Sequence, residues 1–98
     1  MLIGYARIST LDQSHDLQLD ALAKAGCEKV FTETASGASQ LRAALREALD
    51  YTRAGDTLVV WKLDRLSRSL KQLIETVEQL EARGVGLRSL TEALDTSA

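Results

Sequence analysis

The residues Thr57-Leu58-Val59-Val60-Trp61-Lys62-Leu63-Asp64-Arg65-Leu66-Ser67-Arg68 form an apolar run that ends in a cluster of charged side chains. Residues 57–61 predict a short buried strand. Apolar residues then recur with the period of an α-helix, namely Leu70, Leu73, Ile74, Val77 and Leu80. Arg65 and Arg68 are therefore predicted to lie between the carboxyl end of a strand and the amino end of a helix.

Such a junction favours an anion, because backbone N–H groups and the helix dipole are directed toward it. The guanidinium groups of Arg65 and Arg68 add planar donors that match the oxygens of phosphate or carboxylate. A solvated basic turn with Asp64 as the helix cap fits the same residues equally well. The motif alone therefore does not decide the function.

The chain has 98 residues, of which 45% are hydrophobic and 27% charged, and this length and composition fit one compact domain. We expect a cytoplasmic protein, because neither a membrane-spanning apolar run nor a signal peptide is present. The single cysteine, Cys27, excludes an internal disulfide and a cysteine-rich metal site, and core filling is its expected role. With a net charge of −2, any polyanion has to be held by a local basic cluster.

The amino-terminal third predicts a strand, a helix and a second strand. Residues 1–9 form the first strand, in which Ile3, Tyr5, Arg7 and Ser9 share one face. A capping box at 10–13 leads to a helix with Leu17, Ala21, Leu22 and Ala25 on its apolar side and a stop at Gly26. Residues 29–32 are the second strand, followed by a small, polar loop at 34–39.

The remainder continues the alternation of helices and strands. Leu41, Leu45, Ala48 and Leu49 predict a helix that exposes Arg42 and Arg46 and ends near residues 55–56. The helix that follows the third strand closes at 83–84, and residues 85–90 form a fourth strand before the tail. The order βαβαβαβ predicts an α/β fold with a mainly parallel sheet covered by helices.

Open parallel sheets bind ligands at the carboxyl ends of their strands. Three segments of this chain are predicted to place hydroxyl and charged side chains at that edge. These segments contribute Arg7 and Ser9, then Ser36, Gly37 and Arg42, then Asp64, Arg65 and Arg68. Cationic donors around a phosphoryl group stabilise its transition state, so serine attack on a phosphate ester fits this set. Metal catalysis is not indicated, because Asp64 is the one clear carboxylate, and no cofactor motif is present. His15 lacks the context of a Ser-His-Asp triad. Nucleic acid and a small phosphate ester both remain open as substrates.

Three groups of residues together resemble the catalytic domain of resolvase/invertase serine recombinases of the DNA-invertase type. They are Tyr5-Ala6-Arg7-Ile8-Ser9-Thr10 with Gln13, Ser36-Gly37 with Arg42, and Leu63-Asp64-Arg65-Leu66-Ser67-Arg68. The resemblance extends from Met1 through the tail. It implies that Ser9 attacks a DNA phosphodiester and forms a 5′-phosphoserine linkage, from which the strands are religated.

The resemblance also implies individual roles. Arg7, Arg65 and Arg68 would hold the scissile phosphate, Arg42 would support the transition state and Asp64 would orient an arginine. Gln13, Ser36 and Tyr5 would bind substrate, although Tyr5 is also explained as a strand residue packed beneath the site. Leu41 departs from the family pattern, which usually has an acidic residue there.

At the level of the whole protein, the resemblance implies that residues 1–98 are a catalytic core. A long dimerisation helix and a helix-turn-helix DNA-binding domain follow the core in the family, so the core by itself is expected to be inactive. The implied partners are DNA and further copies of the protein, as a homodimer and a synaptic homotetramer. The implied sheet is mixed and five-stranded, with a last antiparallel strand near 93–95, and Leu87, Leu90 and Leu94 would face the dimerisation helix.

Two other functions remain as hypotheses. A non-catalytic anion- or nucleic-acid-binding module would use the same arginines without needing Ser9. A small serine phosphotransferase or hydrolase would use Ser9 on a phosphomonoester. A requirement for Ser9 separates the first of these from a recombinase.

Overall fold

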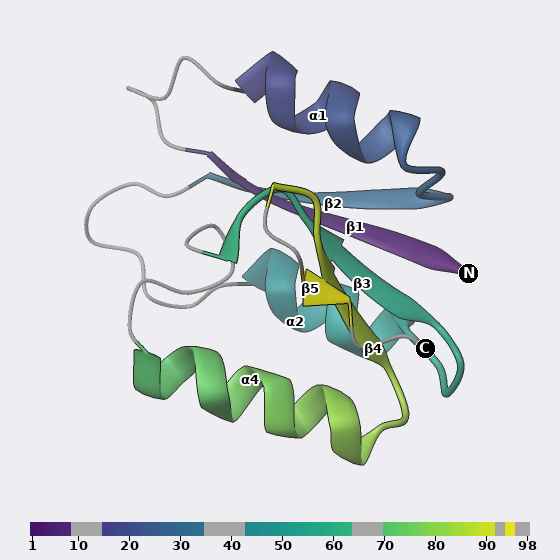
Figure 1. The fold of residues 1–98 in the computed structure, drawn as a ribbon, viewed down its shortest axis with the longest axis vertical. Coiled ribbons are helices and arrows are strands. Elements are labelled where there is room, and N and C mark those ends of the chain that lie inside the picture. Colours follow the sequence, from purple (N-terminus) through teal and green to yellow (C-terminus); the bar gives the residue numbers. More distant parts are fainter. Residues whose placement is uncertain (9–14, 35–42, 64–69, 92–93, 96–98) are drawn as a thin grey trace.

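A computed structural model describes residues 1–8, 15–34, 43–63, 70–91 and 94–95. Its strands are β1 (Leu2–Ile8), β2 (Lys29–Thr34), β3 (Thr57–Val60), β4 (Gly86–Ser89) and β5 (Leu94–Asp95). Its helices are α1 (His15–Lys24), α2 (Ala43–Tyr51) and α4 (Leu70–Ala82). The elements alternate along the chain as the hydrophobic periodicity predicts (Figure 1).

The strands form one sheet in the order β2-β1-β3-β4-β5. The first four strands are parallel, with Tyr5 of β1 opposite Phe31 of β2 on one side and Val60 of β3 on the other. This confirms an α/β fold built on a parallel sheet. The two-residue strand β5 pairs antiparallel with β4, opposite Arg88 and Ser89, where the family resemblance placed such a strand.

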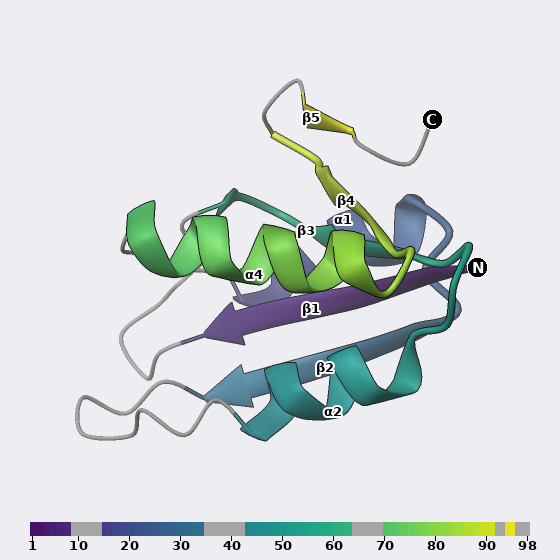
Figure 2. The same cartoon turned by 90° about the horizontal axis from the view of Figure 1, so that it is seen from below.

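Helices cover both faces of the sheet, because each strand of a parallel sheet buries side chains on both sides. Helix α1 lies on one face, and α2 and α4 lie on the other (Figure 2). Ile3 and Tyr5 belong to the core beneath α2 and α4, whereas Ala6 belongs to the core beneath α1. The alternation along β1 predicted from the sequence is therefore confirmed for Ile3 and Tyr5.

The buried face of α1 differs from the predicted one. Leu17 is 62% exposed, whereas Gln18 is fully buried and Leu22 lies one turn further along the same face. Leu19 and Ala25 pack against this core from its margin. The prediction is confirmed for Leu22 and Ala25 and wrong for Leu17, because it assigned the inner face from apolar residues alone and a polar residue occupies one of the inner positions.

Two further expectations about apolar residues are corrected. Leu70 and Ile74 of α4 are 72% and 49% exposed, while Leu80 is buried and Val77 packs against the core.

Leu87 is 1% exposed and belongs to the core beneath α2 and α4, so it is not an uncovered residue. Its side chain points to the face that α2 and α4 cover, because side chains alternate between the two faces along β4. Leu90 packs against the α1 core, and the side chain of Leu94 lies outside the described residues.

The helix ends follow the predicted glycines in two cases. Gly26 and Gly84 come shortly after α1 and α4 and have φ angles of 93° and 73°, which favour glycine. Helix α2 ends at Tyr51, earlier than predicted, and the Thr52 hydroxyl donates to the carbonyl of Leu49 over 2.8 Å. None of the helices among the described residues is long and apolar enough to cross a bilayer.

The turn at Gly84 provides a test of this packing. Gly84→Ala should lower the free energy of unfolding by more than the roughly 1–2 kcal/mol that a left-handed conformation costs a non-glycine residue. The reason is that the added Cβ would lie 3.2 Å from the Ala54 Cβ. Gly55→Ala is the matched control, because its φ is 95° but a Cβ there has no neighbour within 4 Å. Urea denaturation of both variants measures the difference, and equal losses would contradict the contact.

Candidate active site

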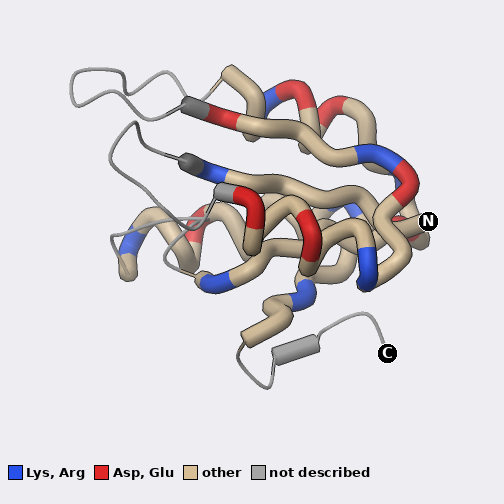
Figure 3. Tube along the Cα trace, turned by 90° about the horizontal axis from the view of Figure 1, so that it is seen from above, with Lys and Arg blue, Asp and Glu red and all other residues tan. Residues whose placement is uncertain are grey.

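The carboxyl ends of β1, β2 and β3 lie along one edge of the sheet, because the three strands are parallel and adjacent. Near this edge, β1 carries Arg7 and β2 carries Glu33, which are directly opposite each other in the register. Figure 3 shows the basic end of β1 beside the acidic end of β2. This edge is the place where the sequence predicts an anion site.

Two of the predicted site residues, Tyr5 and Arg7, lie within the described part of the chain. Arg7 is half-buried and follows Tyr5 by two residues, so the alternation of a strand places both on the face that α2 and α4 cover. The other predicted site residues lie outside the described residues: Ser9, Gln13, Ser36, Arg42, Asp64, Arg65 and Arg68.

Tyr5 is fully buried, and its hydroxyl donates a hydrogen bond to Glu33 Oε1 over 2.7 Å. This position supports the interpretation of Tyr5 as a strand residue packed beneath the site. A direct contact between Tyr5 and substrate stays a prediction. What the geometry does establish is a side-chain link between β1 and β2 just before both strands end.

Glu33 is the residue that sequence reasoning missed. While Oε1 accepts the Tyr5 hydroxyl, Oε2 accepts the backbone N–H of Ala44 over 3.2 Å. Ala44 is the second residue of α2, and the first N–H groups of a helix have no partner inside it. A carboxylate at this point also interacts favourably with the helix dipole. Glu33 thus serves as a cap for α2 from a neighbouring strand.

One carboxylate therefore joins the two elements on which predicted catalytic arginines depend. Arg7 is on β1, whose Tyr5 donates to Glu33, and Arg42 directly precedes α2, whose first turn donates to Glu33. Capping-box searches examine residues three positions apart, whereas these contacts join residues 28 and 11 positions apart. A sequence pattern could reveal Glu33 only as an acidic residue near the end of a strand.

Cys27 is half-buried beside the core under α1. Burial raises the pKa of its thiol, and the Arg88 guanidinium opposes this shift in part. A raised pKa leaves little thiolate at neutral pH, so Cys27 is a poor nucleophile. Its packing supports the core-filling role predicted from the sequence.

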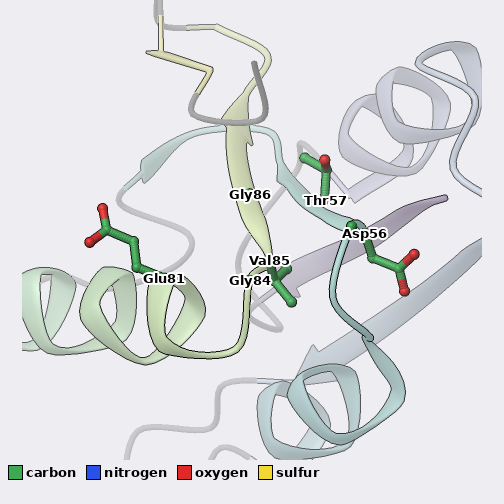
Figure 4. Close-up of a pocket in the computed structure, with 7 residues that line it drawn as sticks. Asp56, Thr57, Glu81, Gly84, Val85 and Gly86 are labelled. Carbon is green, nitrogen blue, oxygen red and sulfur yellow. The ribbon is translucent and has the colours of Figure 1, made fainter.

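A pocket at the opposite, amino-terminal edge has a different character (Figure 4). Its lining comes from the starts of β3 and β4 and the end of α4: Gly55, Asp56, Thr57, Glu81, Gly84, Val85 and Gly86. The carboxylates of Asp56 and Glu81 point away from each other, and Asp56 Oδ2 accepts the backbone N–H of Arg53 over 2.8 Å. No cluster of three or more potential metal ligands occurs among the residues that the structure describes.

The family model for the resolvase N-terminal domain matches residues 2–98. The chain belongs to this family. This resolvase-family domain is 55% identical over 98 residues to the serine recombinase Gin of Escherichia phage Mu. It is 50% identical over 96 residues to the DNA-invertase Hin of Salmonella typhimurium. The alignments cover 100% and 98% of this chain but 51% and 50% of those proteins, so the chain spans about half the length of these curated relatives.

Solved structures share the fold of this resolvase-family domain at low sequence identity. A resolvase family site-specific recombinase from Streptococcus pneumoniae superposes with a TM-score of 0.79 at 19% identity. That alignment covers 98% of this chain and 75% of the other. The catalytic domain of an IS607-like serine recombinase, ISC1926 TnpA, gives a TM-score of 0.74 at 23% identity over 94% of this chain and 68% of the other.

The link through Glu33 can be tested by a double-mutant cycle. Tyr5→Phe should lower the free energy of unfolding by about 1.5–3 kcal/mol, because a hydrogen bond to a charged acceptor is lost. Combined with Glu33→Ala, it should show a coupling energy of at least about 0.5 kcal/mol, measured by urea denaturation. Tyr51→Phe, at a tyrosine that is 45% exposed, is the control and should change stability by less than about 0.5 kcal/mol. Additive effects of Tyr5→Phe and Glu33→Ala would refute the link.

Proposed function

We propose that this chain is the catalytic domain of a site-specific serine recombinase that acts on DNA. The observation that carries the proposal is 55% identity over all 98 residues to a protein named a serine recombinase. The position of Arg7 at the carboxyl edge of a parallel sheet supports it, because this edge is where such sheets bind ligands. The activity of the whole protein is part of the proposal, since the chain spans about half of that relative.

In the proposed reaction, the Ser9 hydroxyl loses its proton and its Oγ forms a bond to the phosphorus of a DNA phosphodiester. The bond from phosphorus to the 3′-oxygen breaks, and that oxygen takes a proton and leaves as a 3′-hydroxyl. A 5′-phosphoserine linkage remains, and a 3′-hydroxyl of a recombining strand attacks it to restore a phosphodiester and release Ser9. The number of phosphate ester bonds is conserved, so the reaction needs no external energy source.

The arginines supply the electrostatic part of this mechanism. Arg7, Arg65 and Arg68 bind the non-bridging oxygens of the scissile phosphate, and Arg42 stabilises the charge that develops in the transition state. Asp64 orients a neighbouring guanidinium, and Gln13 and Ser36 bind the substrate next to it. Glu33 positions this site without contacting the substrate. Its carboxylate accepts hydrogen bonds from β1, the strand that carries Arg7, and from the start of α2, the helix that follows Arg42 in the sequence.

At the level of assembly, we propose that the full-length protein acts in the cytoplasm as a homodimer that pairs into a synaptic homotetramer. Each subunit then contributes one Ser9 to one DNA strand. Two recombining duplexes have four strands to cut, so four active sites are needed. This arithmetic favours a tetramer as the active form.

The nucleophile is tested by Ser9→Ala in the full-length protein. The substitution removes the attacking oxygen and little else, so binding to the DNA site should persist while the covalent protein–DNA adduct disappears. Denaturing gels detect the adduct, and mass mapping of the trapped peptide locates it. Ser67→Ala serves as the control and should retain the adduct. An adduct that persists in Ser9→Ala, or that maps to Ser36 or Ser67, would show that another serine attacks.

The role of the arginines is tested by Arg65→Ala. Loss of one preorganised cationic donor should slow cleavage by a factor of roughly 10² to 10³. Site binding should fall much less, because backbone contacts outside the active site supply most of the affinity. Quench-flow cleavage assays and gel-shift titrations measure the two effects separately. A non-catalytic binding module would instead show lost affinity and no adduct in the unmodified protein.

A further inference from the structure

Trp61 and Lys62 follow the carboxyl end of β3 and form a pair that the proposed mechanism does not use. The Lys62 ammonium lies over the Trp61 ring, with Nζ 4.9 Å from the ring centroid. Lys62 is exposed, and it makes no ion pair with any residue that the structure describes. Its positive charge therefore lies against the ring face, and no carboxylate among the described residues neutralises it.

The backbone of this pair is anchored to the segment that follows β4. The N–H of Leu90 donates to the carbonyl of Val60 over 3.0 Å, and the N–H of Thr91 donates to the carbonyl of Trp61 over 3.1 Å. Trp61 itself is half-buried. The backbone at Trp61 is thus fixed to the edge of the sheet, and the half-buried ring confines a lysine side chain that would otherwise sample many rotamers.

Lys62 lies at the same edge as the predicted phosphate site. Val60 of β3 lies opposite Tyr5 of β1 in the parallel register. Lys62 and Arg7 each follow this pair by two residues, in the direction of the carboxyl edge. Arg65 follows three residues after Lys62. Because a chain spans at most about 3.6 Å per residue, the Cα atoms of Lys62 and Arg65 are no more than roughly 11 Å apart. Lys62 is therefore close in the chain to an arginine that is proposed to hold the scissile phosphate, so a neighbouring phosphate of the same DNA strand is a suitable partner for it.

The chemistry of Lys62 suits a backbone phosphate other than the scissile one. A lysine ammonium is a compact point charge that binds phosphate without the paired geometry of a guanidinium. Contacts of this kind position a protein on DNA and add affinity without reading sequence. Since the net charge of the chain is −2, local cations at this edge matter more than the overall charge.

We propose that Lys62, held by the Trp61 ring, binds a backbone phosphate of the DNA substrate that flanks the cleavage point. The inference rests on the proposed function, because it takes DNA as the substrate. It assigns to the Trp61–Lys62 pair a role in positioning the duplex across the carboxyl edge of the sheet.

The test compares Lys62→Gln with Lys29→Gln in the full-length protein carrying Ser9→Ala, so that binding is measured without cleavage. Lys29 is the matched control, because its ammonium also lies 5.4 Å from two aromatic centroids, those of Phe31 and Tyr51, but it begins β2 at the opposite edge. Affinity for a duplex that contains the recombination site is measured at NaCl concentrations from about 0.05 to about 0.3 M, a range that includes physiological salt.

Lys62→Gln should reduce the slope of log K against log salt concentration by about 0.9, the value for one lost phosphate contact, and weaken binding about fivefold to tenfold at roughly 0.1 M salt. Lys29→Gln should leave the slope unchanged. Lys62→Arg should restore the slope because it restores the charge. If Lys62→Gln has the slope of the parent protein, the proposed contact is wrong. Absence of DNA binding by the parent would instead overturn the proposed function.

Trp61→Leu tests the contribution of the ring. It retains the charge of Lys62, so the salt slope should remain that of the parent, while affinity should fall by about twofold to fivefold as the lysine loses its support. Parent-like affinity in Trp61→Leu would refute the role of the ring. Thermal unfolding of every variant verifies that the fold is intact before binding is compared.

Discussion

The parallel pairing of β1 between β2 and β3 dictates how the other elements of this domain are arranged. Parallel neighbours cannot be joined by a tight turn, so each strand must be followed by a crossover that returns the chain to the same starting edge. The helices α1, α2 and α4 are those crossovers in the described chain, and they cover the two faces of the sheet. The same constraint collects the strand ends, with Arg7 and Glu33, along one edge.

Within that frame, the Glu33 carboxylate joins layers that the sheet alone leaves independent. Its two oxygens accept hydrogen bonds from the Tyr5 hydroxyl and from the Ala44 N–H, so a strand and the start of a helix share one acceptor. Charged acceptors form stronger hydrogen bonds than neutral ones, and partial burial strengthens them further. An active site built from separate segments needs such support, because catalytic geometry tolerates little displacement.

The two edges of the sheet differ in the residues that they carry. At the amino edge, Asp56 and the glycine turns join β3, β4 and the ends of their helices through backbone hydrogen bonds. At the carboxyl edge, the charged residues Arg7 and Lys62 follow or end strands whose interiors are fully buried. This separation lets the buried strands set the stability of the domain, while the residues beyond them are the ones to which binding and catalysis are assigned in the proposed function.

The order of elements and the parallel α/β class followed from the sequence alone, because hydrophobic period, glycine stops and strand length are local properties. The edge of the sheet that carries the active site stays a prediction from the sequence. The motifs around Arg7, Ser9 and Arg65 were likewise readable as short segments. Only the tertiary structure decided that Gln18 rather than Leu17 faces the core, that Leu87 is covered and that Glu33 holds Tyr5 and Ala44. Those outcomes depend on contacts between residues far apart in the chain. A local sequence pattern does not specify which distant residue accepts a hydrogen bond or packs against a side chain.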